Sequence, residues 1–184
     1  NPGTGSRQTL MEDGDVRIEG PIPRVISQAT ELLESWVPKR RALRRDGRFG
    51  PVDLVPRDAW LEGLVNAVVH RSYSMMGDHI RFEIFPNRVE ITSPGRFPGL
   101  VNPDKPLEIK RSARNPRIAR VCADLGITRE LGEGILRIFT EMRRRGLVDP
   151  IYTQSSSTVT LTLLASDALP AEVVSRLTGS ALAI

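Results

Sequence analysis

Hydrophobic residues recur at helical spacing in four stretches of the chain. In residues 22–37 and 61–73 apolar side chains lie three or four positions apart, which is the repeat of one helix face. Asp58 stands where it can cap the second helix. A third helix is predicted to start with Asn115 as its cap and Pro116 at its first position, and to end at Gly126. Residues 132–134 (GEG) open a fourth, which closes with three arginines before Gly146. The apolar faces predicted for the first, second and fourth helices are Val25, Ile26, Ala29, Leu32, Leu33 and Trp36; Leu61, Leu64, Val65, Val68 and Val69; and Ile135, Ile138, Phe139 and Met142.

Apolar and polar residues alternate in other stretches, which predicts strands. Residues 79–85 place Ile80, Phe82 and Ile84 on one side, and residues 89–92 return as a second strand after a turn. Residues 151–154 and 158–164 read as a closing hairpin, and Asp13-Gly14 has the composition of a further turn. This order of elements is typical of an α+β fold. We expect a two-layer sandwich with helices packed on one face of a mostly antiparallel sheet.

Two connecting stretches stand out by composition. The basic run at residues 38–48, PKRRALRRDGR, is interpreted as a solvated loop that continues to near Pro56, with phosphate binding as the alternative. Residues 93–106, SPGRFPGLVNPDKP, are rich in glycine and proline and too long for a simple connection. Such loops usually bind something or are disordered.

Composition narrows the class of protein. The 184 residues are 40% hydrophobic and 26% charged, which suits one soluble domain with appendages. The net charge of +4 and pI near 9.8 permit a nucleic-acid or phosphate partner without requiring one. No apolar run approaches the length of a membrane span, and the first residues do not resemble a signal peptide. Cys122, the single cysteine, excludes an internal disulfide and is predicted to be a core residue in a cytoplasmic protein.

The expected organisation is one folded domain within a longer protein. Residues 21–165 form that domain, residues 1–20 are a flexible linker or tag remnant, and residues 166–184 are a tail or a linker to a further domain.

A row of polar residues borders the apolar face of the second helix. Glu62, Asn66 and His70 are spaced four apart, so they form a slowly winding line on the helix surface. An asparagine oxygen suits Mg²⁺ that shares phosphate oxygens with a nucleotide, and a glutamate one turn earlier can activate water. The simpler interpretation is a half-buried polar edge satisfied by hydrogen bonds.

The sequence of that helix, EGLVNAVVHRSY, resembles the N-box of the GHKL ATPases, in which a glutamate is followed four residues later by an asparagine. Four segments in order are similar to a domain at the C-terminal side of AlbA-type (Schlafen-like) transcriptional regulators, often named RecG-like ATP-dependent DNA helicases. They are LVNAVVHRSYSMMGDHIRFEIFPNRVEITSPGRFPGL, SARNPRIARVCADLG, ELGEGILRIFTEMRRRGL and TVTLTLL. This HATPase_c_4-type resemblance covers residues 22–164 and implies a Bergerat-like fold.

The resemblance also implies a site for ATP and Mg²⁺. Glu62 corresponds to the base that activates water, and Asn66 to the ligand of the metal. Gly95 and Arg96 lie in the segment at the front of the nucleotide lid, and Gly132 and Gly134 in the second glycine box, where a helix start suits phosphate. His70 either lines the implied nucleotide pocket or forms a hydrogen bond with the loop. The implied protein is a nucleotide-binding regulator, at most a slow ATPase, that contacts DNA mainly through other domains.

The sequence departs from that pattern in ways that keep alternatives open. Thr92 or Ser93 stands where the family has an aspartate that accepts the adenine amino group. The chain has no GxxxxGK[ST] motif, so it lacks a P-loop helicase motor. One alternative is a degenerate, nucleotide-free dimerisation module. Another is direct DNA binding by a helix-turn-helix-like segment at residues 115–139, with arginines at 114, 117, 120 and 129 near phosphates.

Overall fold

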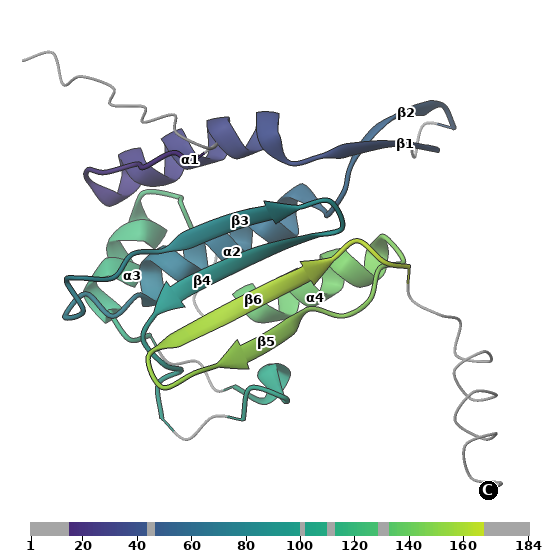
Figure 1. Cartoon of the computed structure of the whole chain (residues 1–184). Helices are drawn as coiled ribbons and strands as arrows, with labels where there is room; N and C mark the ends of the chain where they lie inside the picture. The colour runs from purple at the N-terminus through teal and green to yellow at the C-terminus, as the bar shows by residue number, and fades with distance from the viewer. Residues whose placement is uncertain (1–14, 44–46, 100–101, 110–112, 129–132, 168–184) are drawn as a thin grey trace, which may run out of the picture.

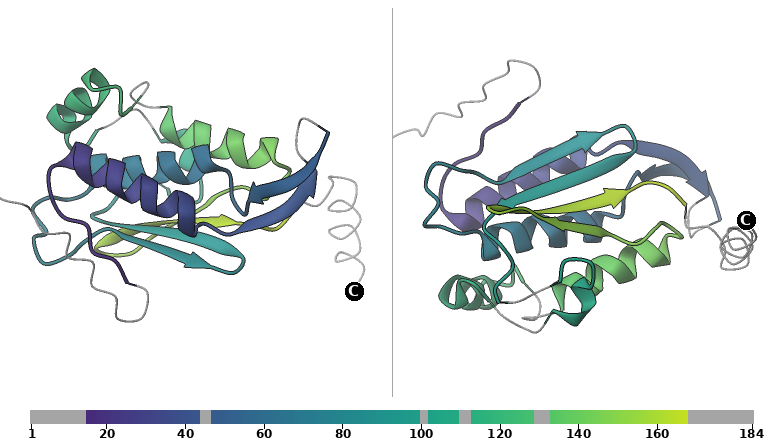
Figure 2. Two further views of the ribbon diagram at one scale, coloured as in Figure 1. Left: turned by 90° about the horizontal axis from the view of Figure 1, so that it is seen from above. Right: turned by 60° about the horizontal axis from the view of Figure 1, so that its bottom comes forward.

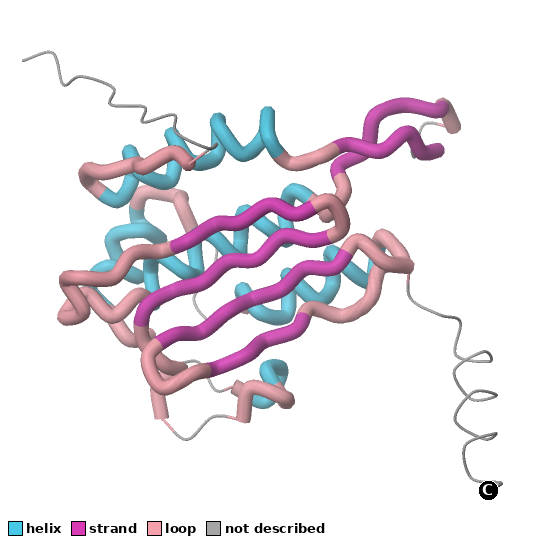
Figure 3. Tube along the Cα trace, in the orientation of Figure 1, coloured by secondary structure: helices cyan, strands magenta, loops and turns pink. Residues whose placement is uncertain are grey.

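Two antiparallel sheets and four α-helices make up the computed structural model, which describes residues 15–43, 47–99, 102–109, 113–128 and 133–167 (Figures 1 and 3). The helices are α1 (Ile22–Trp36), α2 (Arg57–His70), α3 (Pro116–Asp124) and α4 (Gly134–Arg144), with a 3₁₀ turn η1 at Pro106–Glu108. The strands are β1 (Lys39–Leu43), β2 (Phe49–Asp53), β3 (Arg81–Phe85), β4 (Arg88–Pro94), β5 (Ile151–Gln154) and β6 (Thr158–Leu164).

The main sheet has four strands in the order β3-β4-β6-β5, and all neighbours are antiparallel. The hairpins β3–β4 and β5–β6 are local, whereas the central pair β4–β6 joins segments far apart in the chain. Helices α1, α2 and α4 lie over one face of this sheet (Figure 2). The predicted α+β two-layer sandwich is therefore confirmed.

Helix α2 lies at the centre of the helical layer because nearly every face of it meets another element. Its buried residues include Trp60, which is 1% exposed and packs edge-on against Phe82 of β3. Gly63 brings the helix so close to the sheet that a Cβ there would lie 2.7 Å from Ile91 Cδ1. The predicted core residues Leu64, Val65, Val68 and Val69 are buried, and so is Cys122 of α3.

Three local predictions were wrong. The stretch interpreted as a loop, from the basic run to near Pro56, instead contains two strands: β1 lies in the basic run and pairs with β2 from Lys39↔Asp53 to Leu43↔Phe49. Asp58 is not the N-cap of α2, because the helix begins at Arg57 with Pro56 as its N-cap, and Asp58 therefore lies in the first turn. Asn115 does precede α3, but its side chain donates to the carbonyls of Val69 and Arg71 at 2.8 Å and so caps the end of α2 instead.

Other predictions concern residues outside the described ranges. The turn expected at Asp13-Gly14 and the glycine-box residue Gly132 both fall there. Gly126 follows α3 with φ of 68°, the left-handed conformation that glycine adopts after a helix end.

Candidate functional site

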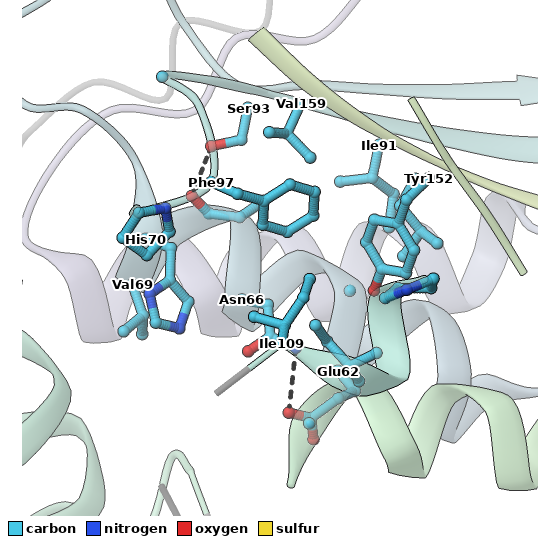
Figure 4. A pocket seen from close by; sticks show the side chains of 18 of the residues that line it. Glu62, Asn66, Val69, His70, Ile91, Ser93, Phe97, Ile109, Tyr152 and Val159 are labelled. Atoms are coloured by element: carbon cyan, nitrogen blue, oxygen red, sulfur yellow. Dashed lines mark hydrogen bonds between the residues drawn. The ribbon is translucent and has the colours of Figure 1, made fainter. Parts of the chain in front are cut away.

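A pocket of about 530 Å³ lies between α2, the end of β4 and the start of α4 (Figure 4). All three members of the polar row on α2, Glu62, Asn66 and His70, line it. They face the pocket because the opposite side of α2 carries Trp60 and Leu64 into the core. Apolar side chains form much of the remaining wall, namely Val69, Ile91, Phe97, Ile109, Tyr152, Val159 and Leu161.

The carboxylate of Glu62 is held from two sides. Asn66 Nδ2 donates to Glu62 Oε1 at 3.3 Å, and Arg137 of α4 forms an ion pair with Glu62 Oε2 at 3.0 Å. Since an ionised carboxylate only accepts hydrogen bonds, the amide nitrogen of Asn66 must face it. The Oδ1 atom of Asn66 therefore remains available to a cation or a donor.

The first residue of α4 is packed against this row. A Cβ on Gly134 would lie 2.6 Å from Asn66 Nδ2 and closer still to Glu62 Oε1. Only glycine lets the helix start approach so closely. The N–H groups of a helix's first turn lack partners within the helix, so this contact places hydrogen-bond donors and a positive dipole end at the pocket.

The loop after β4 forms another wall and is tied to the β5–β6 turn. The backbone N–H of Gly95 donates to Ser157 O at 2.6 Å, and that of Phe97 donates to Gln154 Oε1 at 2.8 Å. Gly95 has φ of 110°, which side-chain-bearing residues rarely adopt. Gly95 and Arg96 both line the pocket, as does Ser93, whose hydroxyl donates to Ala67 O at 2.9 Å.

Ser93 and Thr92, the two residues near the expected aspartate position, point to opposite faces of β4. Side chains alternate along a strand. Ser93 accordingly faces α2 and the pocket, whereas Thr92 Oγ1 lies 2.9 Å from Thr160 Oγ1 on the other face. The pocket-lining residue at this point is therefore a serine.

His70 lies at the pocket end nearest the loop. Burial lowers the pKa of its imidazole below the ordinary 6.5, and the positive charge of Arg114 lowers it further. The ring is therefore neutral at pH 7. Arg114 also donates to the carbonyl of Arg96, which joins the loop to the residues just before α3.

Sequence reasoning missed Phe97 and Tyr152 as pocket-lining residues and Arg137 as the ion-pair partner of Glu62. The rings of Phe97 and Tyr152 pack at 5.7 Å between centroids. Burial, with a smaller contribution from the charge of Glu62, raises the pKa of the Tyr152 hydroxyl well above its usual value. Tyr152 could be found from sequence as the inward residue of a short strand, but nothing local pairs Arg137 with Glu62, 75 positions away.

The arrangement of α3 and α4 does not fit a helix-turn-helix. Residues 125–133 separate the two helices, whereas that motif uses a turn of about three or four residues. The start of α4 would have to face DNA bases, yet Gly134 lies against Glu62 and Asn66. Within the described parts of the chain, no three His, Cys, Asp or Glu side chains are grouped to hold a metal ion, and no helix is long and apolar enough to cross a membrane.

One protein family matches part of this chain. Residues 77–163 match the family described as "Putative ATP-dependent DNA helicase recG C-terminal", HATPase_c_4. The match begins after α2, so Glu62, Asn66 and His70 precede it. No curated protein sequence matches the chain.

A solved structure has the same fold. It is the DIP2311 protein from Corynebacterium diphtheriae, with a TM-score of 0.69 and 24% sequence identity over 85% of this chain. The chain spans about a third of that protein, since the match covers 31% of it. The likeness in fold extends beyond residues 77–163, and the family match within that segment agrees with the HATPase_c_4-type resemblance that the sequence motifs indicated.

Proposed function

We propose that the pocket binds a nucleotide, ATP together with Mg²⁺, and that the domain serves a RecG-like, DNA-associated transcriptional regulator. One observation carries the proposal. Six predicted site residues from three separate segments line a single pocket: Glu62, Asn66, His70, Gly95, Arg96 and Gly134. The family match supports the same ligand class.

The residues suit the two ends of a nucleotide. The N–H groups at the start of α4 and the closely packed Gly134 suit phosphate groups. The rings of Phe97 and Tyr152 offer an apolar surface for a planar base. The Ser93 hydroxyl already donates to Ala67 O, so its remaining capacity is to accept, which suits an amino group such as that of adenine.

Asn66 would hold Mg²⁺ through Oδ1, the amide atom that Glu62 leaves available. The bound ion would supply neutralisation of phosphate charge. Because the described residues contain no cluster of three acidic, His or Cys side chains, protein ligands alone do not complete a site. We therefore expect Mg²⁺ to bind with the nucleotide and not by itself.

Glu62 would position and deprotonate a water molecule in any hydrolysis. Its two carboxylate oxygens are already engaged by Asn66 and Arg137, so a water molecule would have to compete with these two partners in this conformation. We therefore expect slow turnover at most. The same ion pair, with the missing carboxylate at Ser93, is the observation that favours the second candidate, a nucleotide-free dimerisation module.

The test is calorimetric titration of a non-hydrolysable ATP analogue with Mg²⁺ into the whole chain. Binding should be lost in Asn66→Ala and retained in Asn87→Ala, a matched change in the β3–β4 turn at the opposite end of β4. Titration with the GTP analogue checks the inference about Ser93 and should show weaker binding. Absence of binding to the wild type at millimolar analogue, with dimerisation in sedimentation, would support the second candidate instead.

A further inference from the structure

The β1–β2 hairpin stands apart from the sandwich. It extends from one end of the molecule, beyond the four-stranded sheet (Figures 1 and 2). Its two strands pair only with each other among the described elements. At its base, Arg145 of the turn after α4 donates to Asp53 O at 3.1 Å and holds the hairpin to the body.

The two faces of this hairpin differ. Residues directly opposite one another in an antiparallel pair share a face. Lys39, Arg41 and Leu43 therefore lie on the same face as their partners Asp53, Pro51 and Phe49. This outer face is exposed, apart from a half-buried Asp53. On the inner face Ala42, Gly50 and Val52 are half-buried or buried, whereas Arg40 is exposed and forms an ion pair with Asp167 at 3.6 Å.

The outer face combines positive charge with an apolar end. Leu43 and Phe49 are a cross-strand pair, 61% and 69% exposed. Arg41 has no ion-pair partner among the described residues. The distance between Lys39 Nζ and Asp53 Oδ1 is 4.0 Å, which is at the upper limit for an ion pair. Exposed pairs of this kind are weak, so both cations can move to another anion at little cost.

We propose that this outer face binds duplex DNA, with Lys39 and Arg41 on backbone phosphates and Leu43 and Phe49 against the groove. A two-stranded β-ribbon fits the width of the major groove. Positive charge meets the phosphates, and apolar side chains at the end of the ribbon contact sugars and the methyl groups of thymine. A second copy of the chain is a poorer occupant, because symmetric packing of this face would bring Arg41 near its own equivalent.

The experiment measures binding of the whole chain to a fluorescent duplex of about 20 base pairs by anisotropy, between about 50 and 200 mM salt. The variant Lys39→Gln/Arg41→Gln should bind about tenfold more weakly, with a log–log salt slope smaller by about 2, because two phosphate contacts are lost. Leu43→Ser/Phe49→Ser should weaken binding severalfold and leave the salt slope unchanged, because it removes no charge.

The matched control is Arg117→Gln/Arg120→Gln, which removes two exposed arginines from α3. Binding and salt slope should be close to those of the wild type. Thermal unfolding verifies that each variant is folded, and Arg41→Gln alone serves if the double variant is not, with a slope change of about 1.

Several results would overturn the proposal. One is that the wild type does not bind the duplex. Another is that the hairpin and α3 variants lose the same amount of affinity for it. A third is that only the α3 variant loses affinity, which would support the helix-turn-helix interpretation instead. A hairpin-dependent preference for vesicles of phosphatidylcholine with phosphatidylserine over duplex would assign the face to membranes instead. Titration of the ATP analogue should be unaffected by the hairpin changes, so failure here is separable from failure of the nucleotide site.

Discussion

Replacement of Gly134 by alanine tests whether close packing of α4 on the polar row matters for ligand binding. The added Cβ would lie 2.6 Å from Asn66 Nδ2, whereas ordinary contact begins near about 3.5 Å. The ends of the Asn66 and Glu62 side chains must therefore retreat by roughly 1 Å. That movement disturbs the Asn66–Glu62 hydrogen bond and the Arg137–Glu62 ion pair.

The expected effect on stability is small because two contributions oppose each other. Weakening the hydrogen bond costs about 1 kcal/mol, and weakening the partly buried ion pair costs on the order of 1 kcal/mol more. Alanine in place of glycine in a helix returns about 0.5–1 kcal/mol. The net loss of about 1 kcal/mol corresponds to a decrease in Tm of about 2–4 °C for a chain of this size.

The effect on ligand binding should be larger, since Asn66 Oδ1 and the α4 N–H groups are displaced together. We expect the affinity for the ATP analogue with Mg²⁺ to fall at least about tenfold, equivalent to about 1.4 kcal/mol. Calorimetry gives the affinity, and thermal unfolding gives Tm. Gly77→Ala is the control, because no atom lies within 4 Å of a Cβ there, and it should change neither quantity. Undiminished affinity in Gly134→Ala would refute the role assigned to this contact.

Three further predictions concern the core and the pocket. Gly63→Ala should lower the free energy of unfolding by about 1 kcal/mol or more in urea titration, because contact with Ile91 and Leu161 outweighs the gain in helix propensity. Because burial lowers the pKa of His70 in the folded state, the unfolded chain binds the proton more readily, so stability should decrease as pH falls below about 6.5. His70→Gln should remove that decrease in urea titrations at successive pH values. Tyr152→Phe should keep the free energy of unfolding within about 0.5 kcal/mol but weaken binding of the ATP analogue severalfold. Burial raises the pKa of both Tyr73 and Tyr152, so ultraviolet titration of the wild type should show tyrosine ionisation delayed beyond pH 10, and the variant should lose the more resistant component.

The local elements follow from the sequence because their signals are local. Apolar residues three or four apart place α1, α2 and α4, and alternation places the β3–β4 and β5–β6 hairpins. The four-residue spacing of Glu62, Asn66 and His70 is likewise a property of one helix. It predicts that the three side chains share a stripe, and the stripe borders the pocket as expected.

The β1–β2 hairpin escaped prediction because its strands carry no alternation of apolar and polar residues that reads as a half-buried strand. The residues of β1, KRRAL, are mostly basic, and the inner face relies on Ala42 and Gly50, which give weak signals. The charge of the basic run correctly predicted that the outer face is exposed to solvent. It gave no indication that the backbone of β1 would form hydrogen bonds with that of β2.

The sequence by itself determined the helices, the two hairpins of the main sheet and the polar row on α2. Only the tertiary structure decided that β4 pairs with β6, that Arg137 meets Glu62, and that Tyr152 and Phe97 close the pocket above Asn66. The physical reason is distance along the chain. The period of apolar residues predicts which face of a helix or strand is buried. Which other element covers that face depends on packing between segments that are far apart in the chain, and the local sequence carries no signal for it.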